Sequence, residues 1–552
     1  MPLQSGQQKS VNLHKFAMVP RTDIPRSRFN RQHKLSTTFD AGYLVPIFVD
    51  EMLPGDTFSI HMTGFLRTAS PMLYPIMDNL HITTFFFFVP NRLVWTNWVK
   101  MMGERDNPSD SISYTVPTCT SPATGYAVNS LQDYLGLPTV GQLAGSNTYT
   151  HNNLIPRAYN QIYNAWFRSE DLQNSVTKDV GDGPDTAANY VLLRRGKRYD
   201  YFTGALPNPQ KGATAVSLPL GTSAPVYGTG KALGIYAGGS IFGLATDGAA
   251  KLVGDSAAYN TNVGTAVGGS ALPTSVSIGV TPGLVSGLYA DLTTATAATI
   301  NTFRLAMMTQ VILERDARGG TRYTEMNWAH FGVQNPDARL QRPEYLGGST
   351  NPIIVNPTVQ TSGTSASGTT TALGQLAGIT QGKLNGNHGF TYSATEHGHV
   401  IGLMCVDADL SYQQGVRKMW NRQTRYDFYL PGFAALGEQA ILNRELYADG
   451  SANDTAAFGY IGRWDELRYF PSMITGLFRS TATGTLDAYH LAQKFTSLPT
   501  LNDTFIKSTP PLDRVLAVSS QTGKQFIFDS FWQHNVTRAL PMYGVPATLG
   551  RF

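Results

Sequence analysis

Residues 80–90 read Leu-His-Ile-Thr-Thr-Phe-Phe-Phe-Phe-Val-Pro, and they point to the kind of fold this chain adopts. Isoleucine, threonine, phenylalanine and valine all favour strands. Pro90 lacks a backbone N–H and cannot continue a central strand. The stretch therefore predicts a buried β-strand that Pro90 ends.

Other segments of the chain repeat the strand signal. In residues 57–63 (TFSIHMT) Phe58, Ile60 and Met62 alternate with more polar residues, which is the period of a half-buried strand. Residues 400–409 predict another buried strand. Residues 514–519 and 524–531 flank the turn-like sequence Ser-Gln-Thr-Gly and predict a hairpin. The fold is therefore predicted to be mainly β.

Helical patterns are fewer. Residues 154–167 carry apolar side chains at steps of three and four, among them Ile155, Tyr159 and Ile162, as an amphipathic helix does. Residues 91–102 and 300–313 show similar stripes. We expect all three segments to pack against the sheet.

The composition describes a folded chain with few charges. Of its 552 residues 42% are hydrophobic and 11% aromatic, but only 14% are charged, so intrinsic disorder is excluded as the main state. Gly (54) and Pro (31) indicate many turns. Because charged residues are depleted where copies of a protein meet, the low charge favours an obligate assembly.

The small net charge of +4 is unevenly distributed. Residues 1–34 form a basic arm with a net charge of +6, so the rest of the chain sums to −2. The cations of the arm are Lys9, Lys15, Arg21, Arg26, Arg28, Arg31 and Lys34. Such an arm on a neutral body either holds nucleic acid or clamps a neighbouring subunit, and one arm can do both.

Two further segments interleave cations with aromatic residues, a combination that suits single-stranded nucleic acid. The first contains Arg194, Arg195, Lys197 and Arg198. Its alternative interpretation is arginine stacked on aromatic rings and paired with acids, and the two stay equally weighted. The second, residues 417–426, is better explained as such a protein contact, with Asp427 and Glu438 as available partners.

The composition changes between residues 204 and 290. This stretch holds 17 glycines but only five charged residues, and it predicts an insertion that is exposed or self-associating. Residues 359–378, rich in Gly, Thr and Ser, have the same character.

Catalytic motifs are absent from the sequence: it has no nucleophile elbow, P-loop, HExxH or dinucleotide-binding glycine pattern. Cys119 and Cys405 are too few for a disulfide framework or a cysteine zinc site, and we expect both to be buried. His397 and His399 are interpreted as structural. No resident metal or cofactor is predicted, although a structural divalent cation on Asp407 or Asp409 is a possibility that we retain.

The N-terminus lacks the pattern of a signal peptide, and no apolar run approaches the length of a membrane span. We therefore expect a chain without membrane insertion that folds in a reducing compartment.

Longer blocks of sequence carry a family resemblance. They lie at residues 37–46 (TTFDAGYLVP), 53–56 (LPGD), 314–323 (ERDARGGTRY), 330–348 (HFGVQNPDARLQRPEYLGG), 412–415 (YQQG), 424–429 (TRYDFY), 436–439 (LGEQ) and 541–546 (PMYGVP). In these blocks the chain resembles the major capsid protein of microviruses (Microviridae), of the gokushovirus type. The blocks are ordered along nearly the whole chain, so the resemblance is far more specific than any short motif.

The resemblance implies an eight-stranded antiparallel jelly roll with long inter-strand insertions and a few short helices. It also implies a small icosahedral T=1 shell of 60 copies around a circular single-stranded DNA genome, assembled in the bacterial host cytoplasm, and no catalytic residues. The implied partners are further copies of the chain, the DNA, a small basic DNA-binding protein, an internal scaffolding protein, a DNA pilot protein and a bacterial surface receptor.

The chain is accordingly divided into an arm (1–34), a first part of the jelly roll (35–203), a Gly-rich insertion (204–300) and a second part of the jelly roll (301–552). The insertion is expected to form a surface protrusion at the threefold axes that attaches to the host. The competing hypothesis is a secreted β-rich polysaccharide-binding protein or hydrolase, which the aromatic and β-rich composition would also suit.

Overall fold

The computed structural model describes residues 25–212, 300–359 and 376–544, apart from 387, 519, 521 and 522, together with residue 216 and five short strands between 226 and 290. The chain divides into two units, one formed by residues 1–211 and 314–552 and the other by residues 212–313. The limits that the sequence suggested for the insertion, 204 and 300, fall slightly before those of the second unit. Each unit is described by itself.

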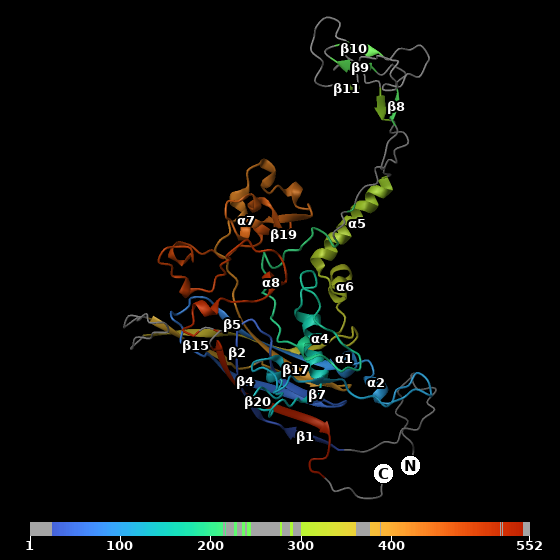
Figure 1. Ribbon diagram of the computed structural model, residues 1–552, viewed down its shortest axis with the longest axis vertical. Helices are drawn as coiled ribbons and strands as arrows, with labels where there is room; N and C mark the ends of the chain where they lie inside the picture. The colour runs from blue at the N-terminus through green and yellow to red at the C-terminus, as the bar shows by residue number, and fades with distance from the viewer. Residues whose placement is uncertain are drawn as a thin grey trace. The chain divides into compact units, whose positions relative to one another are not determined.

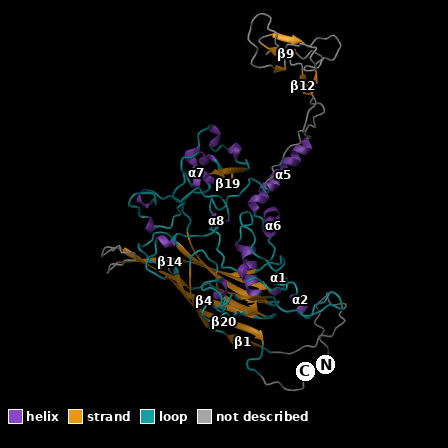
Figure 2. Cartoon of the chain, viewed as in Figure 1, coloured by secondary structure: helices purple, strands orange, loops and turns teal. Residues whose placement is uncertain are grey.

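One large antiparallel sheet dominates the first unit (Figures 1 and 2). Its hydrogen-bonded path runs β1-β20-β4-β15-β14-β5-β17-β3, and β2, β16 and β13 pair with β20, β4 and β5. The strands are β1 (Arg26–Asn30), β2 (His33–Phe39), β3 (Val45–Met52), β4 (Thr57–Thr68), β5 (Leu80–Pro90), β13 (Glu344–Gly347), β14 (Thr350–Val359), β15 (Leu376–Leu384), β16 (Gly389–Ser393), β17 (Gly398–Ala408) and β20 (Phe526–Ala539).

The mainly β, antiparallel fold is confirmed, but the described part of the sheet has eleven strands rather than eight. Three positions in the sheet are each occupied by two consecutive segments. β1 and β2 share one side of β20, β15 and β16 share one side of β4, and β13 and β14 share one side of β5. The number of strands is therefore higher because three positions of the sheet each hold two separate strand segments. The pairing along the sheet is antiparallel throughout.

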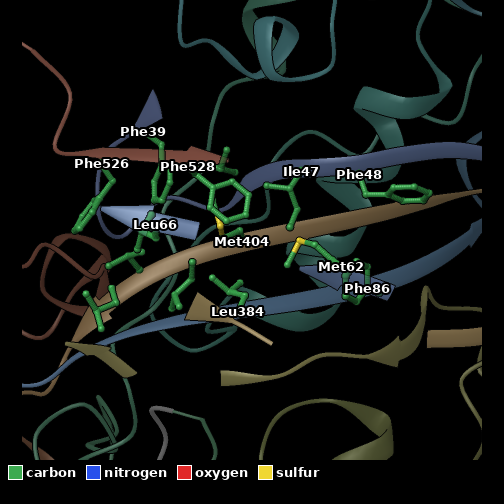
Figure 3. Packing of buried hydrophobic residues seen from close by; sticks show 14 of the residues in the cluster. Phe39, Ile47, Phe48, Met62, Leu66, Phe86, Leu384, Met404, Phe526 and Phe528 are labelled. Atoms are coloured by element: carbon green, nitrogen blue, oxygen red, sulfur yellow. The ribbon is translucent and has the colours of Figure 1, made fainter. Parts of the chain in front are cut away.

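The main core lies inside the curve of this sheet, where the inward-pointing side chains of its strands meet. Phe39, Leu66, Phe86, Met404 and Phe528 come from five different strands and meet in one buried cluster (Figure 3). Each fully buried side chain of this size contributes about 1.5–3 kcal/mol of transfer free energy. Contacts between residues far apart in the chain therefore hold the sheet together.

β5 and β17 are covered on both faces, which explains the apolar run at 80–90. Phe86 points into the main core, whereas its neighbour Phe87 belongs to a second core together with Leu403 of β17. Helix α4 (Leu154–Ile162) and the π-helical turn Tyr163–Phe167 supply the other side of that core, and the Tyr159 hydroxyl donates to the Leu44 carbonyl at 2.9 Å. The helix and the packing predicted for 154–167 are confirmed.

Seven further helices, five of them a single turn long, and several small sheets are present in the described chain. The helices are α1 (Asn91–Val94), α2 (Trp98–Met101), α3 (Leu131–Tyr134), α5 (Ile300–Gly319), α6 (Tyr323–Phe331), α7 (Asn443–Leu446) and α8 (Asp503–Ile506). The small sheets are β6 (Thr118–Thr120) with β7 (Thr150–Asn152), β18 (Glu438–Leu442) with β19 (Ala457–Gly462), β8 (Val226–Gly228) with β12 (Leu288–Ala290), and β9 (Gly234–Ala237) with β10 (Ser240–Gly243) and β11 (Ser277–Ile278). Single 3-10 turns lie at Ala187–Asn189, Lys418–Asn421, Arg425–Asp427, Pro431–Phe433, Ala452–Thr455, Asp465–Leu467, Gly476–Phe478, Asp487–Tyr489 and Leu512–Arg514.

Two of the predicted elements need correction. The hairpin predicted for residues 514–531 is wrong: β20 pairs with β1, β2 and β4, and Leu512–Arg514 is a 3-10 turn that follows two prolines. Residues 519, 521 and 522 of the predicted turn lie outside the described residues. The helix 300–313 is present within α5, but its side chains Leu305 and Met308 are exposed in the single chain rather than packed.

Candidate nucleic-acid and assembly interface

The C-terminal part of the basic arm belongs to the sheet. β1 pairs with β20 from Arg26 opposite Ala539 to Asn30 opposite Asn535. The next residue, Arg31, donates its backbone N–H to the His534 carbonyl at 2.7 Å. The arm is thus fixed to the body of the protein from residue 26 onward, while Lys9, Lys15 and Arg21 lie outside the described residues.

The four described cations of the arm differ in how they are held. Arg31 makes two hydrogen bonds to the Asp50 carboxylate, at 2.6 and 3.2 Å, and Lys34 lies 3.2 Å from Asp529 on the exposed surface. Arg26 donates to the Gly55 carbonyl. The Arg28 guanidinium has no hydrogen bond or ion pair within the described part of the chain, so its charge is available to a partner such as a phosphate.

In the segment 194–198 two arginines contact both aromatic rings and polar oxygens. The Arg194 guanidinium lies 4.0 Å above the Tyr43 ring and donates to the Ser508 carbonyl at 3.0 Å. Arg195 pairs with the buried Asp407 at 3.1 Å and lies 5.1 Å from the Phe85 ring.

The other two cations of this segment are also held by the protein. The Lys197 ammonium donates to the Gln493 side chain at 2.8 Å and lies 4.1 Å above the Phe505 ring, and burial lowers the pKa of Lys197 to about 8. Arg198 pairs with Asp409 at 3.3 Å. All four cations thus have protein partners, the arrangement that the alternative interpretation described. Binding of nucleic acid by this segment stays a prediction.

Residues 417–420 and 422 of the segment 417–426 line a surface hollow of about 400 Å³ together with three tyrosines, Tyr201, Tyr412 and Tyr469. Its acidic partners are not the two that the sequence suggested. Arg422 pairs with Glu466 at 3.0 Å and Lys418 lies 3.5 Å from Glu445. Asp427 instead accepts hydrogen bonds from the start of its own 3-10 turn, and Glu438 pairs with Arg318.

The candidate metal ligands have protein partners as well. Asp407 accepts from Arg195 and Ser508, and Asp409 lies 3.2 Å from His81 besides its pair with Arg198. Within the described residues no group of three or more His, Cys, Asp or Glu side chains gathers in a way that could hold a metal ion. Both cysteines are buried and free, as predicted.

The two histidines named beside them are placed differently from each other. His397 contacts the Trp98 ring edge-on, with 5.6 Å between the ring centres. His399 is buried in β17, and burial lowers its pKa to about 4. Both have the surroundings of structural residues.

The surface of the single chain carries several large apolar side chains, among them Trp328 and Phe331 of α6. Contiguous exposed apolar surface marks a place where a protein meets a partner. Together with the antiparallel curled sheet and the cationic strand β1, this surface is typical of a protein that tiles a virus shell.

Sequence reasoning missed two exposed aromatic residues on the sheet, Phe65 of β4 and Phe531 of β20. A signal for both was present. In each strand the buried residues hold even numbers, such as Phe58 and Trp532, so an aromatic residue at an odd number points to the opposite face.

Comparisons with known proteins agree with the class indicated by the fold. A family described as "Capsid protein (F protein)" matches residues 17–548. The chain is 45% identical to the capsid protein VP1 of Bdellovibrio phage phiMH2K, with 98% of this chain and 99% of that protein covered. It is 43% identical to capsid protein VP1 of Chlamydia phage 1 (97% and 98% covered) and 32% identical to that of Spiroplasma virus 4 (97% and 98% covered).

The chain belongs to this family of phage capsid proteins, and the resemblance to microvirus capsid proteins is confirmed. It is a structural component of the virion and not an enzyme, so the alternative of a secreted polysaccharide-binding protein or hydrolase is set aside. Among the described helices, none combines the length and the apolar character needed to span a bilayer.

Proposed function

We propose that sixty copies of this protein close into a T=1 icosahedral shell around a circular single-stranded DNA genome. The match to the capsid family over residues 17–548 is the observation that carries this proposal. The low content of charge and the exposed apolar side chains of α6 support extensive contacts between copies.

The basic arm is proposed to face the DNA. The Arg28 guanidinium has no hydrogen bond or ion pair among the described residues, and Arg28 lies only a few residues after the rest of the arm. Contacts between such cations and phosphates are largely independent of base sequence and weaken as salt rises. Arg194, Arg195, Lys197 and Arg198 stay a second, weaker candidate, because their charges are already paired or stacked.

The shell cannot neutralise the genome by itself. Sixty arms with a net charge of +6 supply roughly 360 positive charges. A gene for 552 residues alone spans about 1,650 nucleotides, each with one phosphate. Small cations or a small basic DNA-binding protein are therefore proposed to neutralise most of the DNA. An internal scaffolding protein and a DNA pilot protein are proposed as further partners, with assembly in the host cytoplasm.

The insertion at 204–300 is proposed to contact a bacterial surface receptor. Residues 212–313 form a unit of their own, and none of the strands that the structure describes within this range belongs to the large sheet. Deletion of this unit is therefore expected to leave shells intact in electron micrographs and to abolish adsorption to the host. Adsorption at the wild-type level would refute the proposal.

Electron microscopy of purified particles tests the shell, and a triple substitution of Arg26, Arg28 and Arg31 by Ala tests the arm. We expect closed particles about the size of a 60-copy shell, and a lower DNA content or earlier release of DNA in the triple variant as salt is raised. Normal DNA content and salt tolerance in the variant would mean that the arm only clamps subunits. A monomer under every condition would overturn the shell itself.

A further inference from the structure

The outward side of the half of the sheet that contains β4 and β20 is open to solvent. In both strands, side chains alternate between the buried core and the surface. Figure 1 shows α1 and α4 on the other side of the strands, away from β1 and β20. We call the outward-pointing residues of β1, β2, β4, β15 and β20 the outer sheet face.

Two phenylalanines stand on this face at neighbouring positions. Phe65 is 39% exposed and lies opposite Asp529, while Phe531 is 43% exposed and lies opposite Thr63. Because Thr63 and Phe65 are two residues apart on one strand, the two rings are diagonal neighbours, with roughly 7–8 Å between their backbones. An exposed pair of rings in mid-strand offers two flat apolar surfaces side by side.

Cations surround these rings. Lys34 of β2 lies opposite Phe531, Lys383 of β15 lies opposite Phe65, and Arg67 follows Phe65 on the same side of β4. Arg67 and Lys383, like Arg28, have no hydrogen-bond or ion-pair partner for their charged groups among the residues the structure describes.

Negative charge is nearly absent from the same face. Asp529 is the one acid at the described outward positions of these five strands, and it is already engaged by Ser36 at 2.6 Å and Lys34 at 3.2 Å. Most other outward positions carry threonine, serine, asparagine or glutamine, which donate and accept hydrogen bonds.

The exposed rings, the unpaired cations and the shortage of acids on the outer sheet face help to decide which partner covers it: a second copy of the chain or a nucleic acid. A second copy that met this face with its own outer sheet face would bury Arg67 and Lys383 without acids to pair with them, which is costly, and interface cores are depleted in charge. A single-stranded nucleic acid instead brings phosphates to the cations and unstacked bases to the rings.

We propose that the outer sheet face binds single-stranded DNA, with bases stacked on Phe65 and Phe531 and phosphates held by Arg28, Arg67 and Lys383. The proposal rests on the proposed function, because it takes the cargo of the shell to be single-stranded DNA. It extends DNA contact from the arm to the rigid sheet and assigns stacking to side chains outside the arm. Such stacking accepts any base.

Binding of fluorescent oligo(dT) to the full-length protein, measured over a range of salt concentrations, tests the stacking role. The double variant Phe65→Leu, Phe531→Leu keeps the apolar character but removes the aromatic faces. We expect it to bind at least about tenfold more weakly with an unchanged salt dependence, and the Phe→Tyr double variant to bind as wild type does. Phe470→Leu is the control for a ring that is exposed outside the sheet, and it is expected to leave oligo(dT) binding unchanged.

The role of the cations is tested separately, through the salt dependence of oligo(dT) binding. The double variant Arg67→Ala, Lys383→Ala is expected to lower the slope of log affinity against log salt by about 1.4, since each lost phosphate contact on a single strand contributes about 0.7. Thermal unfolding of each variant should match wild type, because the substituted side chains are exposed. An unchanged slope would overturn the role of the two cations.

Ultraviolet cross-linking of intact wild-type particles needs no variant. We expect peptides that contain residues 57–68 and 526–539 to carry nucleotide adducts. Adducts confined to the arm would overturn the sheet-face site and leave the packaging of DNA standing, whereas particles without single-stranded DNA would overturn the proposed function. Leu variants that bind oligo(dT) as wild type does but fail to form shells would show that this face contacts another copy.

Discussion

Two groups of cations in this protein have opposite surroundings. Arg194, Arg195, Lys197 and Arg198 stand close together in the sequence, yet each is stacked on a ring, paired with an acid or bound to an oxygen of the protein. Arg28, Arg67 and Lys383 come from three distant strands, and the described residues leave their charges without partners. A dense run of cations is therefore a poor guide to charge that is available for binding, because the fold brings acids to it.

The largest effect is expected where a paired cation loses its acid. Asp407 is buried and accepts from Arg195 and Ser508, so Asp407→Ala leaves a guanidinium without its carboxylate. We expect the free energy of unfolding to fall by about 3–5 kcal/mol in denaturant titrations. Asp529→Ala on the outer sheet face is the control, and its exposed pair with Lys34 should contribute little. Equal losses in the two variants would remove the difference between the two groups.

A buried histidine is expected to make the stability of the fold depend on pH. Burial lowers the pKa of His399 to about 4, whereas the usual value is 6.5, so the unfolded chain binds more protons between these values. Stability is then complete above pH 6.5 and falls toward pH 4, by up to about 3 kcal/mol for this group. His399→Gln should weaken the pH dependence of the unfolding free energy but not remove it, because burial also lowers the pKa of His534 to about 4. A wild-type profile in the His399 variant would contradict the assignment.

Within the arm, two arginines separate anchoring from DNA binding. Arg31→Ala removes two hydrogen bonds to Asp50 and is expected to cost about 1–2 kcal/mol of stability. Arg28→Ala should leave stability unchanged and lower the salt slope of oligo(dT) binding by about 0.7. Denaturant titration and salt-dependent binding of the two single variants give both quantities. The reverse pattern would assign the anchoring role to Arg28.

The smallest effect is expected for Arg198→Ala. Because this guanidinium already pairs with Asp409, we expect the salt slope of oligo(dT) binding to stay within error of wild type. A decrease of about 0.7 would instead confirm that the segment 194–198 contacts phosphates and would break the comparison with the outer sheet face.

Local patterns allowed the elements of the fold to be predicted. The alternation in β4, the apolar run of β5 and the stripe of α4 each depend on neighbours in the sequence, and all three elements are present. The hairpin at 514–531 failed because β20 finds its partners in β1, β2 and β4, more than 450 residues earlier in the chain. Turn signals do not report such distant pairing.

The partners of the candidate site residues could not be predicted from the sequence, because they too are brought together by pairing between distant parts of the chain. Asp407 stands 212 residues from Arg195, and nothing in the spacing of the cations indicates which acid the fold brings to them. The outer sheet face is different, since Phe65 breaks the alternation of β4 in a way that is visible in the sequence. What the sequence lacks is the register that places Lys383 opposite that ring.

The separate unit at residues 212–313 has a consequence for how these phages diversify. The described ladders of the large sheet include no residue of this unit, so we expect the sheet to tolerate changes in the length of the unit. We therefore expect the sequences of related phages to differ more within this unit than within the strands of the large sheet, which an alignment of those sequences would test.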